Sequence, residues 1–179
     1  MHVPRIDAEG AAQQALDQYD TDKDGLLSPT ELEHCQGILS ALKTFDRDGD
    51  GMVSPEEISH RVEMYRERGV GLKMVSCKVL LNGRPLPGAT VELIPESFLG
   101  EEVHEARGTS RSGGTVPLYV PAEALPSDLA GTQGVQLGVY KVKITHDSVK
   151  LPEDYTSGEG LGVEIGPSSH AAVFWLKKK

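Results

Sequence analysis

"FDRDGDGMVSPEE" (residues 45–57) places three aspartates at alternating positions, with two glycines among them and a glutamate at the end. "YDTDKDGLLSPTE" (residues 19–31) repeats this order twenty-six positions earlier, with a lysine in place of the first glycine. Carboxylates crowded in this way repel one another, because like charges about 4 Å apart interact unfavourably even in water. The repeated pattern therefore predicts that a cation binds in each stretch.

The spacing indicates which cation each stretch fits. Ca²⁺ takes roughly six to eight oxygen ligands, and a loop of about twelve residues supplies them from positions 1, 3, 5, 7, 9 and 12, with a bidentate glutamate last. A glycine at position 6 permits a turn with positive φ. The expected ligands are Asp20, Asp22, Asp24, the Leu26 carbonyl, Ser28 and Glu31 in the first loop (20–31), and Asp46, Asp48, Asp50, the Met52 carbonyl, Ser54 and Glu57 in the second (46–57).

Helices are expected on both sides of each loop. The pairs Ser28-Pro29 and Ser54-Pro55 are typical of a helix N-cap followed by proline at the first helical position. Ser-x-x-Glu ordinarily forms a capping box, but here we expect the glutamate to turn to the ion. Apolar residues ahead of each loop predict an entering helix: Leu16 and Tyr19 before the first, Leu42 and Phe45 before the second.

Both loops resemble those of the EF-hand family, and every liganding position of the pattern is filled. The resemblance covers residues 8–68. It implies an all-α EF-hand pair that binds two calcium ions, in a domain that we place at residues 1–70. Met52 and Met64 are the only internal methionines of this half, so a structural calcium module is expected rather than a sensor with a methionine-rich groove.

The segment between the loops is short. Only residues 32–45 separate them, fewer than in common EF-hand pairs, and one straight helix there would be about 21 Å long and hold the loops apart. Gly37 predicts instead two short helices bent near Gly37–Ser40, so that Leu27 and Val53 pair across the loops. The close spacing of the two loops also resembles that in dockerins, which are protein-docking modules. Glutamate at position 12 and two entering helices depart from the dockerin pattern, so that reading is an alternative.

After residue 70 the pattern changes to alternation of apolar and polar residues, which is typical of strands with one buried face. The dipeptide Asn82-Gly83 predicts a tight hairpin between the first two strands. Long loops are expected at 95–107 and 121–137. About seven strands in residues 71–179 predict a β-sandwich, and the whole chain is expected to be α+β with two domains that touch across a short linker. The strands are expected at 74–81, 89–94, 115–120, 140–145, 162–165 and 171–177.

The strand-rich part resembles carboxypeptidase-regulatory-like domains, which have a transthyretin-like sandwich fold. The stretches with this resemblance are "LLNGRPLPGATVELIP", "GVYKVKIT", "LPEDY" and "GVEIGPSSHAAVFWLK", and it covers residues 72–179. Such domains occur in exported proteins and lipoproteins of planctomycete-type bacteria, so the resemblance implies export or a place in the cell envelope. The acidic turn usual before the third strand is here "TSRSGG", which lacks the acidic residues, so we expect no ion or ligand role for that turn.

Charge and cysteine content limit the function further. The net charge is −9, with fifteen acidic and seven basic residues before position 71, and a nucleic-acid partner normally needs a basic face instead. We expect no membrane span, because no apolar run approaches about eighteen residues. No signal peptide is visible in "MHVPRIDAEG", so the compartment is not determined by the residues. Cys35 and Cys77 are expected to be buried free thiols.

Catalytic motifs are incomplete. "HEARG" begins like a zincin helix but has Gly108 where the second histidine belongs, and "GTSRS" lacks the closing glycine of a nucleophile elbow. We therefore expect a calcium-binding protein that is not an enzyme, with the sandwich as an adhesion or interaction module. The alternatives are a carbohydrate-binding sandwich braced by a calcium domain, with a protein or cell-surface glycan as partner, and a regulatory fragment of a larger enzyme. Trp175 and Phe174 are expected to point to opposite faces of their strand.

Overall fold

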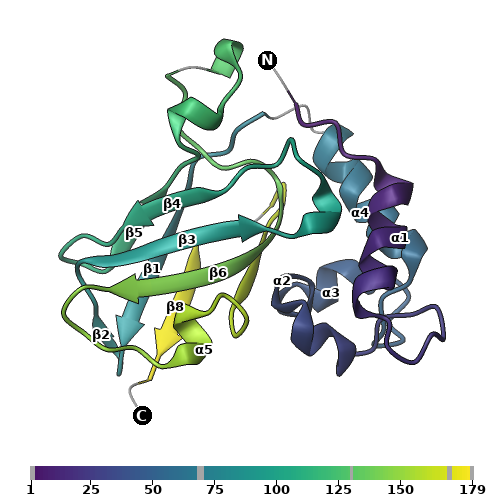
Figure 1. Cartoon of the computed structure of the whole chain (residues 1–179), viewed down its shortest axis with the longest axis horizontal. Coiled ribbons are helices and arrows are strands. Elements are labelled where there is room, and N and C mark those ends of the chain that lie inside the picture. The colour runs from purple at the N-terminus through teal and green to yellow at the C-terminus, as the bar shows by residue number, and fades with distance from the viewer. Residues whose placement is uncertain (1–2, 68–70, 130, 169–170, 178–179) are drawn as a thin grey trace.

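The computed structural model describes residues 3–67, 71–129, 131–168 and 171–177. It shows an α+β chain, with a helical part that ends at Glu67 and a β-sheet-rich part after it, as the sequence predicts. Figure 1 shows the helical part on the right and the strands on the left. The helix stop expected at Gly69 lies outside the described residues.

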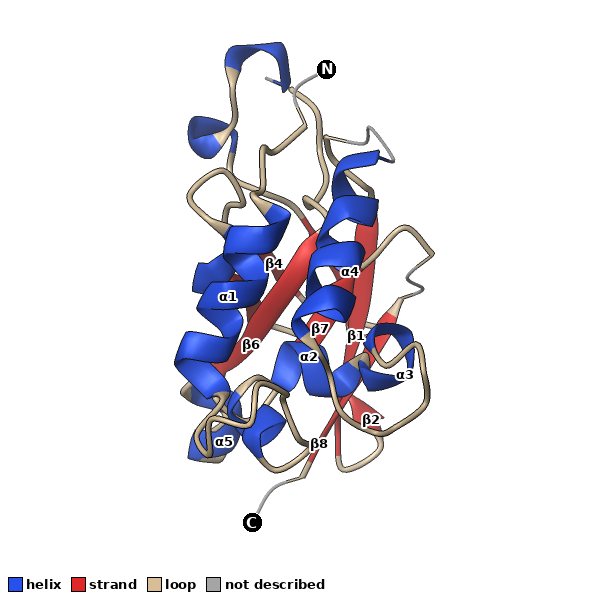
Figure 2. Cartoon of the chain, turned by 90° about the vertical axis from the view of Figure 1, so that its right-hand side faces the viewer, coloured by secondary structure: helices blue, strands red, loops and turns tan. Residues whose placement is uncertain are grey.

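The helical part is built around two long helices that pack against each other, α1 and α4, which lie side by side in Figure 2. Asp7 caps α1, because its carboxylate accepts a hydrogen bond from the N–H of Gly10 at 3.2 Å. Ala11 and Ala15 on α1 and Val62 on α4 are buried, and small alanine side chains let the two helices approach closely. The elements are α1 (Ala8–Tyr19), η1 (Glu31–His34), α2 (Gln36–Ser40), α3 (Leu42–Phe45) and α4 (Pro55–Glu67).

The segment between the loops is broken into short helices, as expected, and one of its two breaks directly follows the predicted stretch Gly37–Ser40. Its helical turns are interrupted at Cys35 and Ala41, whose φ angles of −124° and −114° are not helical. Gly37 lies inside α2 and is not the bend. A methyl group at Gly37 would overlap the side chain of Val139, so glycine is needed here for close packing against the strands rather than for flexibility.

The strand-rich part contains two four-stranded sheets. In one sheet β1 pairs antiparallel with β2 and β5 and parallel with β8. In the other the order is β4-β3-β6-β7, and all neighbours are antiparallel. The strands are β1 (Val75–Leu81), β2 (Arg84–Pro85), β3 (Ala89–Pro95), β4 (Ala106–Thr109), β5 (Thr115–Leu118), β6 (Gly138–His146), β7 (Gly162–Ile165) and β8 (Ala172–Leu176). Short helical turns lie between them at η2 (Ser97–Leu99), η3 (Ala122–Ala124), η4 (Ser127–Leu129) and α5 (Glu153–Thr156).

The predicted hairpin turn is present, but the strand that follows it and pairs with β1 is not the predicted one. Asn82 and Gly83 have φ angles of 50° and 78°, as a two-residue hairpin turn requires, and they join β1 to the very short β2. The strand at 89–95, expected to pair with β1, instead lies in the other sheet next to β6. Alternation fixes which residues are buried and leaves open which strands pair.

One strand, β4, falls partly in a stretch predicted as loop. Its inward residues are Ala106 and Gly108, which are too small to produce an alternating apolar signal. A side chain at Gly108 would overlap the carbonyl oxygen of Pro117, so the small residue is required where the two sheets meet. A bridge between Arg107 and Tyr119 joins the sheets at this edge.

The alternating apolar residues form the core of the sandwich. Val91 and Leu93 of β3 and Val142 and Ile144 of β6 are completely buried, as predicted. Cys77 is buried as a free thiol, and so is Cys35 in the helical part. On β8 Phe174 is buried whereas Trp175 is 65% exposed, which confirms that they point to opposite faces.

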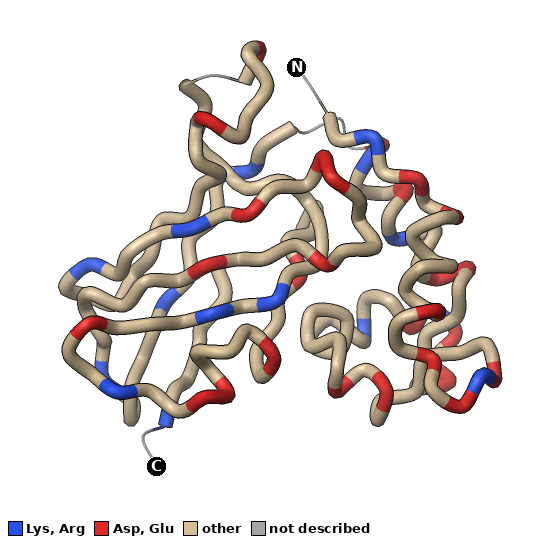
Figure 3. Tube along the Cα trace, viewed as in Figure 1, with Lys and Arg blue, Asp and Glu red and all other residues tan. Residues whose placement is uncertain are grey.

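The helical part packs directly on the sandwich through α2, which lies against β6 and β7. A methyl group at Gly162 of β7 would overlap the backbone of Gly37 and Gln36, so two backbones touch at this point. Ile38 on α2 is fully buried and belongs to one apolar cluster that extends through both parts. Burial of one such side chain contributes roughly 1.5–3 kcal/mol. Figure 3 shows acidic residues concentrated on the helical part and both signs mixed over the strands.

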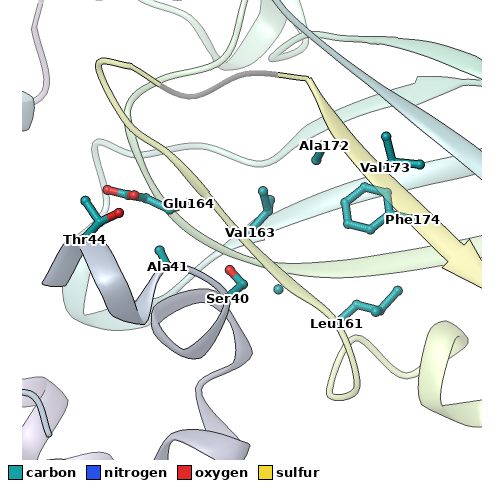
Figure 4. A pocket seen from close by; sticks show the side chains of 10 residues that line it. Ser40, Ala41, Thr44, Leu161, Val163, Glu164, Ala172, Val173 and Phe174 are labelled. Carbon is teal, nitrogen blue, oxygen red and sulfur yellow. The ribbon is translucent and has the colours of Figure 1, made fainter. Parts of the chain in front are cut away.

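A pocket with a volume of about 410 Å³ lies beside this contact (Figure 4). Ser40 and Thr44 form its helical wall, and residues of β7 and β8, including Val163 and Phe174, form the other wall. Among the residues that the structure describes, no helix is both long and apolar enough to cross a bilayer.

Gly162→Ala is expected to destabilise the contact between the two parts, because the new methyl group would press on the backbone of α2. Overpacking of this kind typically costs about 1–3 kcal/mol. Thermal or denaturant unfolding of the full chain measures the change. Gly113→Ala is the matched control, since a side chain there meets open space, and it is expected to leave stability almost unchanged. Equal stability of both variants would contradict the close contact.

Candidate functional site

The two acidic loops lie at the same end of the helical part (Figure 1). The first connects α1 to η1, and the second connects α3 to α4. In each loop the three aspartates are gathered so that a carboxylate oxygen from each lies within 4.8 Å of the others. The first aspartate of each set is half-buried and the other two are exposed. These are the groups expected from the sequence at positions 1, 3 and 5.

The backbone N–H groups of the first loop orient these carboxylates. The N–H of Gly25 donates to Oδ2 of Asp20 at 3.0 Å. The N–H groups of Asp24 and Leu26 donate to Oδ1 of Asp22 and Asp24 at 3.1 and 2.9 Å. Each carboxylate therefore has an oxygen held by the backbone and turned toward the inside of the turn.

The second loop repeats this arrangement. The N–H of Gly51 donates to Oδ2 of Asp46 at 3.0 Å. The N–H groups of Asp50 and Met52 donate to Oδ1 of Asp48 and Asp50 at 3.1 and 2.8 Å. Two sequences that differ at most intervening positions thus fold into loops with the same hydrogen bonds.

Positive φ angles are needed at two positions of each loop. Gly25 and Gly51, at position 6, have φ angles of 87° and 86°, as the sequence predicts. Position 4 also has positive φ, 62° at Lys23 and 82° at Gly49. The requirement at position 4 was not predicted. Glycine in the second loop suggests positive φ there, but the first loop has lysine at the same position, which does not.

Glu31 forms a capping box with Ser28, and its turn toward an ion stays a prediction. The N–H and hydroxyl of Ser28 donate to Oε2 of Glu31 at 2.9 and 2.8 Å, and the N–H of Glu31 donates to the Ser28 hydroxyl at 3.4 Å. The N–H of Thr21 donates to Oε1 at 2.7 Å, so this carboxylate also closes the loop onto its own beginning. These hydrogen bonds, with the Ser28 N–H the strongest contributor, outweigh burial and lower the pKa of Glu31 to about 2.

Glu57 has the same position in the second loop. Its Oε2 accepts from the N–H of Ser54 at 2.9 Å, and its Oε1 accepts from the N–H of Arg47 at 2.6 Å. Burial alone would raise the pKa of Glu57, but the hydrogen bonds from Ser54 and Arg47 outweigh it, and the pKa lies below the ordinary value. Both glutamates are therefore ionised at neutral pH and lie at the closing end of a cluster of aspartates.

The two loops are joined by a short backbone pairing. The N–H of Leu27 donates to the carbonyl of Val53 at 2.9 Å, and the N–H of Val53 donates back to the carbonyl of Leu27 at 3.0 Å. Both side chains are completely buried. The predicted pairing of position 8 across the loops is confirmed, and the broken segment between them makes it possible.

The structure adds contacts between distant residues that no sequence pattern indicated. Tyr19, the last residue before the first loop, donates its hydroxyl to Glu96 at 2.7 Å. Tyr65 on α4, after the second loop, donates its hydroxyl to Glu164 at 2.7 Å. Glu96 and Glu164 belong to the sandwich, far away in sequence, and the side chains of both are buried. Arg61 forms an ion pair with Glu164 at 2.5 Å.

Comparison with known proteins agrees with the loop geometry. A family model described as EF hand matches residues 12–36 and 39–61, so the chain contains an EF-hand segment, which indicates calcium binding. No curated protein matches the chain. Among solved structures, a 9R-lipoxygenase from Cyanothece PCC8801 aligns with a TM-score of 0.29 and 10% identity, over 93% of this chain and 23% of that one. That likeness is too weak to support any conclusion about fold or function.

Because the loops share a backbone pairing, loss of one calcium site is expected to weaken the other. Glu57→Gln should strongly weaken calcium binding at the second loop and also lower the calcium affinity of the first. Glu31→Gln should strongly weaken the first loop and lower the calcium affinity of the second by a comparable factor. Coupling of this kind is typically about five- to 150-fold. The amide resonances of Gly25 and Gly51, one per loop, report each site separately in a calcium titration followed by NMR.

Glu33→Gln and Glu56→Gln are the matched controls, because they remove neighbouring exposed carboxylates that are not among the expected ligands. They are expected to leave both titration midpoints nearly unchanged. If the intact loop keeps wild-type affinity in both Glu31→Gln and Glu57→Gln, the pairing of Leu27 with Val53 does not couple the sites.

Proposed function

We propose that this chain, which contains an EF-hand segment, binds two calcium ions and is a structural calcium module joined to a non-enzymatic interaction domain. The observation that supports this most directly is the duplicated loop. Each loop gathers three aspartate oxygens, holds them with the same backbone hydrogen bonds and ends in an ionised glutamate. Convergent carboxylates at this spacing fit a hard cation that takes oxygen ligands.

The donor set of each loop fits calcium. Three carboxylates, a backbone carbonyl, a serine and a glutamate offer only oxygen, whereas zinc prefers nitrogen and sulfur. Binding would replace part of the hydrogen bonds of Glu31 and Glu57 by bonds to the ion. The residues that would hold the ions are Asp20, Asp22, Asp24, Leu26, Ser28 and Glu31, and Asp46, Asp48, Asp50, Met52, Ser54 and Glu57.

A structural role is favoured over a sensor role by the way the helical part is packed. A sensor opens to expose an apolar groove, often rich in methionine. Here Ile38 and Cys35 are completely buried in the cluster shared with the sandwich, and α1 also packs against η2 of the sandwich. Opening would therefore require separation of the two parts of the chain.

The sandwich is proposed to be an interaction or adhesion module, with a fold of the carboxypeptidase-regulatory-like, transthyretin-like type. Trp175 supports a binding role, since it is 65% exposed and lies across from Leu80 on β1. Val173, on the same face of β8, is 43% exposed. An exposed indole on a sheet face suits a protein surface or a sugar ring. The incomplete motifs around Gly108 support a non-enzymatic role, since this residue lies in strand β4 where the sheets meet.

Location and wider context follow from the resemblance to domains of exported bacterial proteins. We propose a place outside the cytoplasm or in the cell envelope. Glycan recognition by the sheet face is the second candidate function, and the exposed Trp175 is the observation that favours it.

Calorimetry is expected to show two Ca²⁺ bound per chain, with Mg²⁺ much weaker because it demands smaller, near-ideal octahedral geometry. The affinity can fall anywhere between about 10⁻⁷ and 10⁻³ M for loops with these ligands. Removal of calcium with EDTA should lower the melting temperature of the full chain, since an ion that binds only the folded state stabilises it. A stoichiometry of zero would contradict the proposed function.

Trp175→Ala is expected to abolish binding to the partner of the sandwich. It should change the free energy of unfolding by no more than about 0.5 kcal/mol, the usual range for surface substitutions. Trp175→Tyr, which keeps an aromatic ring, should retain part of the binding. A glycan array probed with the wild-type protein separates the two candidates, because binding to defined sugars favours glycan recognition. Unchanged binding by Trp175→Ala would rule out this face.

A further inference from the structure

A buried carboxylate of the sandwich, Glu96, lies at the junction with the first loop. Glu96 directly follows the last residue of β3 and is only 1% exposed. Its backbone N–H donates to the carbonyl of Val139 on β6 at 2.9 Å, and its carbonyl accepts from the N–H of Leu99 at 3.0 Å. Two backbone hydrogen bonds, one to a central strand and one within η2, therefore fix its position in the sandwich.

Both side-chain oxygens of Glu96 accept hydrogen bonds from residues of the helical part. The hydroxyl of Tyr19 donates to Oε2 at 2.7 Å, and the thiol of Cys35 donates to Oε1 at 3.6 Å. The hydroxyl of Ser97, the next residue, donates to Oε1 of Gln18 at 3.0 Å. These contacts come from the two sides of one loop, since Tyr19 directly precedes Asp20 and Cys35 follows Glu31 by four residues.

The protonation states agree with this hydrogen bonding. Burial, together with the hydrogen bond to Glu96, raises the pKa of Tyr19 far above its ordinary value, so the phenol keeps the proton that it donates. Burial raises the pKa of Cys35 in the same way, and the thiol also remains a donor. Burial raises the pKa of Glu96 as well, although the donated hydrogen bonds and nearby Lys141 oppose that effect. A carboxylate is removed from water here, which is costly unless its oxygens are hydrogen-bonded.

We propose that Glu96 is a positioning residue for the first calcium loop: it holds Tyr19 and Cys35, on either side of the loop, so that a sandwich residue that does not touch the ion sets the affinity of that site. The proposal rests on the proposed function of the loops as calcium sites. Its physical basis is preorganisation, because a loop whose ends are already held together loses less conformational freedom when it closes on an ion.

The second loop has a separate connection to the sandwich, which makes the proposal specific. Tyr65 donates to Glu164 at 2.7 Å, the same distance as Tyr19 to Glu96. Tyr65 lies eight residues beyond Glu57, well inside α4, whereas Tyr19 is adjacent to the first ligand of its loop. Loss of the two hydroxyls should therefore have different effects on the first site, although both would weaken the contact between helices and sandwich.

The test uses the full chain and a calcium titration followed by the amide resonances of Gly25 and Gly51. Each of these N–H groups donates to the first aspartate of its own loop, so each reports its own site. Glu96→Gln and Tyr19→Phe are expected to weaken calcium binding at Gly25 by about fivefold or more, the lower end of typical coupling, with a smaller change at Gly51. Tyr65→Phe should change the midpoint at Gly25 less than about twofold, well below typical coupling.

A second control separates hydrogen bonding from simple loss of charge. Glu159 is exposed and lies near Glu96, and its carboxylate accepts a hydrogen bond from Lys141 at 3.1 Å rather than from Tyr19 or Cys35. Glu159→Gln removes a negative charge in the same region and is expected to leave the midpoint at Gly25 nearly unchanged. In a double mutant, the effects of Tyr19→Phe and Glu96→Gln are expected to be non-additive, because the two side chains are in direct contact.

The proposal is overturned if Glu96→Gln and Tyr19→Phe leave the first site at wild-type affinity, or if both sites weaken equally. It is also overturned if Tyr65→Phe or Glu159→Gln weakens the first site as much. If Glu96→Gln fails to fold, the comparison of Tyr19→Phe with Tyr65→Phe decides alone. Absence of any response to calcium in the wild-type protein would instead overturn the proposed function, and the inference with it.

Discussion

The contact between the backbones of Gly37 and Gly162 is the constraint on which the arrangement of the two parts depends. It brings α2 against β6 and β7 at a distance that no side chain on either residue would allow. With α2 at this position, the chain on either side must turn at Cys35 and Ala41. Those turns return the second loop to the first, where Leu27 and Val53 pair.

Buried charge accompanies this contact at two points. Glu96 and Glu164 are carboxylates of the sandwich that are largely removed from water, a change that is unfavourable for a charge without partners. Each accepts a hydrogen bond from a tyrosine hydroxyl of the helical part, and Glu164 also forms an ion pair with Arg61. Since loss of one partner would leave a buried charge unsatisfied, separation of the two parts is costly. The calcium loops are thus attached to a rigid support rather than to a flexible linker.

Much of the candidate site could be predicted from the sequence because its acidic residues lie within single stretches of chain. Asp20, Asp22 and Asp24 are gathered by one turn, and the same holds for the second loop. The buried residues of the strands could be predicted for a similar reason, since alternation along one strand determines which side chains face inward. The positive φ at Lys23 and the strand β4 were missed, because lysine and small residues give no local signal there.

The sequence by itself determined the two acidic loops with their clustered aspartates, the α+β order of the chain and the buried face of most strands. Each of these depends on residues a few positions apart, whose geometry is set by local backbone conformation. The tertiary structure alone decided that β3 leaves β1 for the other sheet, that Gly37 serves close packing rather than a bend, and that Glu96 meets Tyr19 and Cys35. Those outcomes join residues tens of positions apart, and no short pattern records which distant surfaces will fit together.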